Sequence, residues 1–104
     1  MDIELLRDLC RGNRIKWTIH ALKRIRERGI SAEEVLRCVT QGQVIENYPD
    51  DRPFPSCLIH CVSDGRHLHA VVSSDGTEIT IITAYIPNGD EWEDDYQTRK
   101  AVRP

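Results

Sequence analysis

The chain has 104 residues, 39% of them hydrophobic and 30% charged, which is typical of one soluble globular domain. No stretch reaches the ~20 consecutive apolar residues that a transmembrane helix needs, and the acidic N-terminus lacks the apolar run of a signal peptide. We therefore expect a single cytoplasmic domain over residues 1–104, with a core over about 3–99 and no membrane partner.

The charge is unevenly distributed along the chain. The formal net charge is −3, but residues 7–28 hold eight Lys or Arg against two acids, whereas residues 90–95 hold five acids and no base. Such asymmetry predicts a basic face that can collect a polyanion and an acidic tail that can cover, repel or balance it. Ordinary solvated surface is the competing interpretation of both blocks.

Three helices are expected in the first forty residues, because apolar side chains recur there at three- and four-residue intervals. Asp2 is placed to cap the first helix, Gly29 follows the second, and Ser31-Ala-Glu-Glu34 is a capping box that begins the third. A short extended link or edge strand at 14–19 separates the first two. The expected helices cover residues 2–12, residues 19–28, and residue 31 to a stop at Gly42.

The spacing then changes from helical to alternating. Residues 43–48 are a strand candidate, and the proline-rich loop 49–55 cannot continue it. Asp64-Gly65 and Asp75-Gly76 are tight-turn signals, so the strands around them should form an antiparallel meander. Those strands are expected at 57–63, 66–73 and 78–86. The prediction is an α+β fold, with N-terminal helices packed on one face of a roughly four-stranded, mainly antiparallel sheet and the option of a terminal helix.

The four cysteines are interpreted as buried thiols, because they fall in apolar periodic segments. A zinc site is the alternative, since His60, Cys61, His67 and His69 are close in sequence. The spacing argues against zinc, because no C-x-x-C pair is present and Cys57 and Cys61 lie about 13 Å apart along a strand. No motif for ATP, dinucleotide or acyl-transfer chemistry is present. We therefore expect neither a metal nor a cofactor.

The second helix and the last two strands carry the residues best suited to chemistry. A rotation of about 100° per residue places His20, Arg24 and Arg28 along one helix edge. A titratable imidazole beside two guanidiniums suits a phosphodiester substrate, and it also suits a salt-bridged helix surface. His69 lies on a half-buried strand and Tyr85 at a strand end, where structural packing is the common alternative.

Such residues can cleave RNA without a cofactor. A general base takes the proton from a 2′-hydroxyl, arginines stabilise the charge on the phosphorane, and an acid protonates the leaving 5′-oxygen. The candidate catalytic residues are His20, His69 and Tyr85, and the candidate substrate-binding residues are Lys16, Arg24, Arg28 and Arg99. The competing hypothesis is a non-catalytic module that holds a protein or a nucleic acid in the same groove.

Several short patterns together resemble a bacterial family of domains of unknown function. They are W-x-x-H-A-x-x-R-x-x-x-R-G-I at 17–30, G-x-V-I-E at 42–46, L-H-A-V-V at 68–72 and T-A-Y-x-P at 83–87, with Tyr48, Pro49 and Trp92. The resemblance covers residues 15–99. That family is grouped with RelE/ParE-like ribonuclease toxins of the barnase, colicin and EndoU type.

The resemblance implies a RelE-like or barnase-like fold and a toxin that cleaves RNA, free or bound to the ribosome. It also implies a cognate antitoxin protein with a zinc-finger or helix-turn-helix module. By the resemblance, His20, Arg24, Arg28, His69 and Tyr85 line the active groove, so His20 and Arg24 should face the same cleft as His69 and Tyr85. A ParE-like inhibitor of a DNA-processing enzyme is compatible with the same fold.

Overall fold

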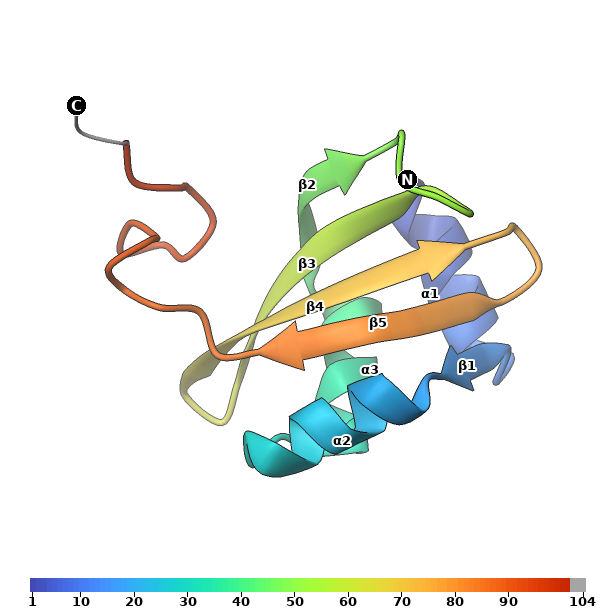
Figure 1. The fold of residues 1–104 in the computed structure, drawn as a ribbon, viewed down its shortest axis with the longest axis horizontal. Helices are drawn as coiled ribbons and strands as arrows, with labels where there is room; N and C mark the ends of the chain where they lie inside the picture. Colours follow the sequence, from blue (N-terminus) through green and yellow to red (C-terminus); the bar gives the residue numbers. More distant parts are fainter. Residues whose placement is uncertain (102–104) are drawn as a thin grey trace.

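A computed structural model describes residues 1–101 and shows three helices packed against a five-stranded sheet (Figure 1). The α+β class and the N-terminal position of the helices are confirmed. The elements, in chain order, are α1 (Ile3–Arg11), β1 (Ile15–Trp17), α2 (Ile19–Glu27), α3 (Ala32–Gln41), β2 (Gln43–Tyr48), β3 (Ser56–Ser63), β4 (Arg66–Ser74) and β5 (Ile79–Tyr85).

Each helix begins at a side chain that accepts a backbone hydrogen bond. The Asp2 carboxylate caps α1, and the Thr18 hydroxyl accepts from the third residue of α2 at 2.9 Å. The capping box at α3 is complete, because Ser31 and Glu34 each accept a backbone N–H from the other at 3.1 Å. Gly29 follows α2 with a φ of 67°, a conformation that suits glycine. The expected helices are confirmed, with small shifts at their ends.

The strand order is β1-β5-β4-β3-β2, and β3, β4 and β5 form the expected antiparallel meander. The segment expected at 14–19 as an extended link or an edge strand is an edge strand, β1, which pairs in parallel with the start of β5, so the sheet has five strands where about four were expected. The sheet is therefore mixed. Residues 87–101, which we call the C-terminal segment, contain an isolated bridge between Trp92 and Arg99 and no helix, so the optional terminal helix is absent there.

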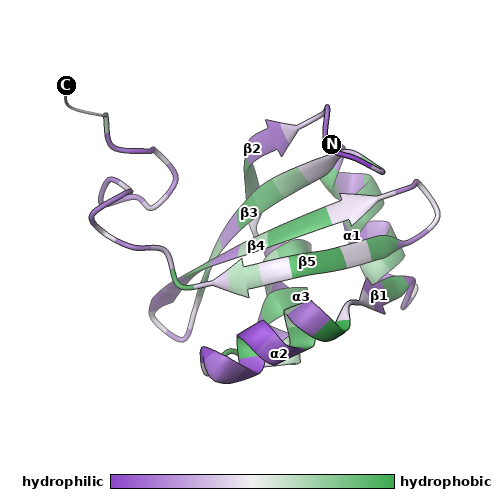
Figure 2. Cartoon of the chain, viewed as in Figure 1, coloured by the Kyte–Doolittle hydropathy of each residue, from purple (hydrophilic) through white to green (hydrophobic). Residues whose placement is uncertain are grey.

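The sheet has two different faces. One is covered by the helices, where Ala21 and Ile25 of α2 join a buried cluster with Ile59, Ala70 and Ile81. We call the opposite face the histidine face, because alternation along β3 and β4 places His60, His67 and His69 on it. The C-terminal segment leaves the end of β5 and runs beside the sheet, and it is largely hydrophilic (Figures 1 and 2). Its Trp92 and Tyr96 rings pack on His69 and His67 of the histidine face.

The cysteines are free thiols. Cys10, Cys38 and Cys57 are buried and Cys61 is partly buried, which confirms the interpretation made from their apolar surroundings. Within residues 1–101, no group of three or more His, Cys, Asp or Glu side chains is arranged to hold a metal ion. No helix in the same range is long and apolar enough to cross a membrane.

Candidate functional site

Three imidazoles gather on the histidine face. His60 and His69 are directly opposite each other in the β3–β4 register, and their rings meet edge to face at 5.7 Å. His67 lies two residues before His69 and therefore points to the same face. Its Nδ1 is 2.9 Å from Nε2 of His60, and the two rings are stacked. The pairing of β3 with β4 thus builds a continuous patch of titratable rings.

His69 is fully buried, and its contacts fix the position of its proton. Nε2 is 2.7 Å from the carbonyl oxygen of Tyr96, which can only accept a hydrogen bond, so Nε2 carries the proton. Burial lowers the pKa of His69, which favours the neutral ring at neutral pH. Nδ1 is then an unprotonated acceptor, and it lies 3.4 Å from the hydroxyl of Tyr85.

Tyr85 completes an acid–base pair with His69. The two residues are opposite each other in the β4–β5 register, and their rings meet edge to face at 5.4 Å. Burial raises the pKa of the Tyr85 phenol, although the cations of Arg99 and Arg28 oppose this effect. The phenol therefore keeps its proton at neutral pH, beside an imidazole nitrogen that has none.

Arg99 belongs to a second polar group at the same face. Its guanidinium forms a two-pronged ion pair with Glu46, at 2.6 and 3.0 Å, and lies 4.6 Å above the Trp92 ring. Tyr48 donates to the same carboxylate at 2.5 Å. Arg99 lowers the pKa of Glu46, while burial and the carboxylate raise the pKa of Tyr48 to about 12. The ion pair between Arg99 and Glu46 therefore holds the C-terminal segment against β2.

The C-terminal segment is a folded cover over the histidines. Trp92 is only 2% exposed and lies against the edge of the His69 ring at 4.6 Å, while Tyr96 stacks on His67 at 4.3 Å. The Gln97 amide nitrogen is 3.0 Å from Nδ1 of His60. A substrate could therefore reach His69 only if part of this segment moved.

Helix α2 forms a basic edge beside β5 (Figure 1). The short strand β1 pairs only with the first half of β5. Helix α2 packs beside the second half. There Arg28 donates to the carbonyl oxygen of Ala84 at 2.8 Å and to the Thr83 hydroxyl at 3.2 Å. This contact places a guanidinium next to Tyr85.

The structure brings some of the predicted site residues together and leaves others apart. His69 and Tyr85 are in contact, Arg99 borders the same cluster, and Arg28 lies at its edge. The other three lie elsewhere: Lys16 is exposed on β1, His20 is exposed on α2, and Arg24 pairs with Glu27 at 3.0 Å.

The expectation of one shared cleft is therefore not met for His20 and Arg24. Helix α2 turns Ala21 and Ile25 into the core on the helix-covered face, whereas alternation along β4 directs His69 to the opposite face. Within residues 1–101, His20 makes no polar contact with the histidine cluster.

Sequence reasoning missed several members of the cluster. His60 was weighed only as a zinc ligand, although its place on an alternating strand beside a β-turn puts it opposite His69. Trp92, Tyr96 and Gln97 lie outside every periodic segment, so no local pattern indicated their contacts. Glu46 appeared only as part of a family motif.

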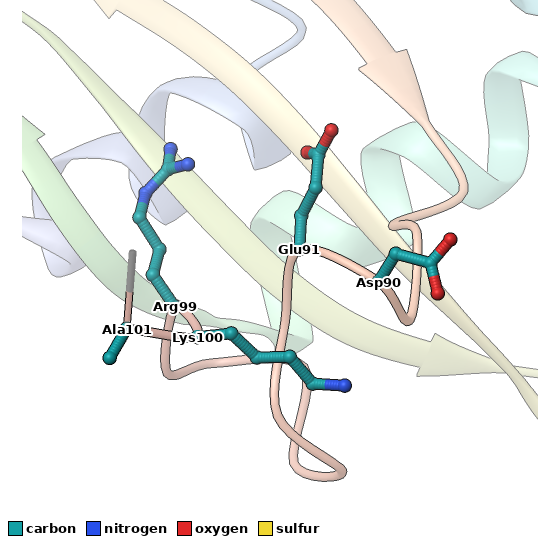
Figure 3. Close-up of a pocket in the computed structure, with 5 residues that line it drawn as sticks. All are labelled: Asp90, Glu91, Arg99, Lys100 and Ala101. Carbon is teal, nitrogen blue, oxygen red and sulfur yellow. The ribbon is translucent and has the colours of Figure 1, made fainter. Parts of the chain in front are cut away.

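Two hollows border the C-terminal segment. One, of about 300 Å³, is lined by Asp90, Glu91, Arg99, Lys100 and Ala101. Figure 3 shows Arg99 and Glu91 extending from two separate stretches of the segment, so the lining mixes both signs of charge. The other, of about 240 Å³, includes His60, Gln97 and Gly42. Neither is a cluster of cations, so neither favours an anion strongly.

Comparison with known proteins gives a family. The model for a domain of unknown function, DUF4258, matches residues 17–86. The chain belongs to the DUF4258 family. The DUF4258 match contains β2 to β5, the three histidines, Tyr85 and the basic edge of α2, and it ends just before the C-terminal segment. No curated protein and no solved structure matches the chain significantly.

Proposed function

We propose that this protein is a metal-independent endoribonuclease of the RelE-like toxin type, and that RNA binds across the histidine face. The observation that carries the proposal is the pair formed by His69 and Tyr85, with Arg28 beside it. A neutral imidazole, a protonated phenol and a fixed cation are the three groups that RNA transesterification requires.

The proposed reaction assigns one role to each group. Nδ1 of His69 accepts the proton of a ribose 2′-hydroxyl, and the resulting oxygen attacks the adjacent phosphorus. Tyr85 gives its proton to the 5′-oxygen as the P–O5′ bond breaks, which leaves a 2′,3′-cyclic phosphate and a 5′-hydroxyl. Arg28 stabilises the charge that develops on the phosphorane.

The remaining predicted residues would bind the RNA rather than react with it. Lys16, His20 and Arg24 lie on β1 and α2, away from the His69 ring but on the basic part of the chain. Contacts of this kind are sensitive to salt, because binding RNA releases condensed counterions. Arg99 would join them once the C-terminal segment moves and its ion pair with Glu46 opens.

The proposal includes a cognate antitoxin, of zinc-finger or helix-turn-helix type, that blocks the enzyme. This part of the proposal is based on the sequence patterns, which resemble those of toxin families. Co-expression tests it, because the product of a neighbouring gene should form a complex with the chain and restore growth.

A non-catalytic binding module is the second candidate, and one observation favours it. His69 is fully buried, and both of its ring nitrogens already have partners within the protein. Under this alternative the histidines only hold the C-terminal segment in place. Loss of the Tyr85 hydroxyl would then leave the binding of any partner unchanged.

Cleavage of end-labelled RNA in the presence of EDTA distinguishes the two candidates. Tyr85→Phe removes only the hydroxyl that faces His69, and Tyr48→Phe is the matched control because its hydroxyl faces Glu46. We expect Tyr85→Phe to slow cleavage by about 10²- to 10⁴-fold and the control to cleave normally. A 2′-deoxy substitution at the cleaved position should abolish the reaction.

A second pair of variants tests the cation. Arg28→Gln should slow cleavage, whereas Arg37→Gln, on the exposed side of α3, should not. Absence of RNA cleavage and of growth arrest with the wild-type chain would refute the enzymatic proposal. Equal cleavage by wild type and Tyr85→Phe would refute the assigned role of Tyr85.

A further inference from the structure

A third hollow, of about 360 Å³, lies at the end of the sheet away from the C-terminal segment. Its lining includes Lys16 of β1, Ser73 of β4, and Thr80 and Ile82 of β5. The loop at 49–55 closes the opposite side with Arg52 and Phe54. We call this hollow the loop pocket. Its volume is at the small end of the range for small-molecule sites.

The loop pocket carries a net positive charge. The five ion pairs within residues 1–101 all involve other arginines, so Lys16 and Arg52 have no carboxylate partner in that range. Asp51 also lines the hollow, and the hydrogen bond that its carboxylate accepts from Ser56 leaves its negative charge in place, so these three side chains together carry one net positive charge. Two cations on opposite walls of one pocket favour an anionic ligand.

The same pocket exposes apolar surface. The Phe54 side chain is 45% exposed and Ile82 is 37% exposed, although both are large hydrophobic residues. An aromatic ring that remains open to solvent can stack on a nucleobase, and stacking of this kind tolerates every base. The hydroxyls of Ser73 and Thr80 provide hydrogen-bond donors and acceptors at the edge of a bound ring.

The loop pocket and the histidine cluster share one face of the sheet. Ser73 and His69 are four residues apart on β4, so their side chains point to the same side and lie about 13 Å apart along the strand. A few nucleotides of a single RNA strand can span that distance. The pocket is therefore positioned to hold a nucleotide near the proposed cleavage site.

We propose that the loop pocket binds one nucleotide of single-stranded RNA and contributes to the choice of sequence. The base lies against Phe54 and Ile82, and its phosphate is held by Lys16 and Arg52. This inference rests on the proposed function for the identity of its ligand, but it can be tested without any cleavage.

The test is a titration of the full ¹⁵N-labelled chain with each of the four nucleoside 5′-monophosphates, followed by amide chemical shifts. Inorganic phosphate and ribose 5-phosphate are titrated in parallel. We expect the shifts to concentrate at Lys16, Phe54 and Thr80, with one nucleotide preferred. We also expect each phosphate without a base to bind at least about tenfold more weakly, because it lacks stacking.

Two variants separate the base from the phosphate. Phe54→Leu keeps an apolar side chain but loses the ring, so nucleotide affinity should fall about tenfold while phosphate affinity is unchanged. Lys16→Gln should weaken both ligands. Val62→Ala is the matched control, because Val62 is also an exposed apolar residue but lies near the other end of β3.

The proposal is overturned if no nucleotide shifts these amides, if phosphate alone binds as tightly as a nucleotide, or if Phe54→Leu binds like the wild type. An acidic peptide that competes better than nucleotides would overturn it as well. If nucleotides bind in the loop pocket but the protein cleaves no RNA, the proposed enzymatic function is refuted and the nucleotide-binding role of the loop pocket stands. If cleavage depends on Tyr85 but Phe54→Leu changes neither the nucleotide affinity nor the cleavage sites, only the proposed role of the loop pocket is refuted.

Discussion

Replacement of Trp92 by alanine should release the C-terminal segment from the histidine face while the rest of the fold persists. Trp92 is nearly fully buried between the edge of the His69 ring and the Arg99 guanidinium, each at 4.6 Å. It is the buried hydrophobic residue of a segment that is otherwise largely hydrophilic (Figure 2). Without the indole, the remaining polar contacts must hold the segment alone.

The expected magnitude follows from the buried area. A tryptophan buries roughly 200 Å² of surface, which at about 25 cal/mol per Å² corresponds to about 5 kcal/mol. Substitutions of this kind in protein cores cost about 3–5 kcal/mol. The loss cannot exceed the free energy with which the segment docks, because the segment can detach as a unit. We therefore expect the free energy of unfolding to fall by about 3 kcal/mol.

Two measurements check this prediction. Urea denaturation gives the change in unfolding free energy, and Glu93→Ala, an exposed neighbour in the same segment, should change it by less than about 0.5 kcal/mol. Proton NMR titration of the His69 ring should show its pKa rising toward the ordinary value, because the burial that lowers it is removed. A loss below about 1 kcal/mol with an unchanged His69 titration would refute the reasoning.

Three further predictions concern stability. Burial lowers the pKa of His60 and His69, so below about pH 6.5 the unfolded chain binds protons that the folded chain does not. The free energy of unfolding should therefore fall as the pH falls below about 6.5, by up to about 1.4 kcal/mol per pH unit for each histidine. Gly42→Ala should cost more than about 3 kcal/mol, because a Cβ there would overlap the backbone carbonyl oxygens of Cys38 and His60. Glu34→Ala should cost about 2 kcal/mol, since it removes half of a capping box and an ion pair with β4.

Urea denaturation measures all three. The pH effect should be reduced in Trp92→Ala, where His69 is no longer buried, and a stability that stays flat from about pH 7 to 5 would contradict it. Gly12→Ala is the control for Gly42, because its added Cβ would meet no atom closer than 3.4 Å. Glu33→Ala, one residue before Glu34 on the exposed side of α3, should change stability little. If Gly12→Ala lost as much stability as Gly42→Ala, the overlap of the added Cβ would not be the cause. If Glu33→Ala lost as much stability as Glu34→Ala, the capping box and the ion pair would not be the cause.

The sequence by itself determined the local elements of this protein. Caps such as Ser31 and turns such as Asp64-Gly65 act through hydrogen bonds and backbone conformations a few residues apart, so their effect can be inferred from the order of residues. Alternation then placed His67 and His69 on one face of β4. The contact between His69 and Tyr85 was not determined in this way. A two-residue turn at Asp75-Gly76 would pair His69 with Ile82, whereas the longer turn and the register shift between Val71 and Val72 place Tyr85 opposite His69.

Tertiary structure alone decided what surrounds those residues. The bond from His69 to the Tyr96 carbonyl joins residues 27 apart, and the ion pair between Arg99 and Glu46 joins residues 53 apart. The parallel pairing of β1 with β5 and the separation of His20 from His69 are equally non-local. Such contacts form when packing brings distant segments together, and no spacing of residues along the chain encodes which segments meet. For this reason the sequence indicated a histidine, a tyrosine and several arginines, but only the fold showed that His69 lies under a folded cover and that His20 lies outside it.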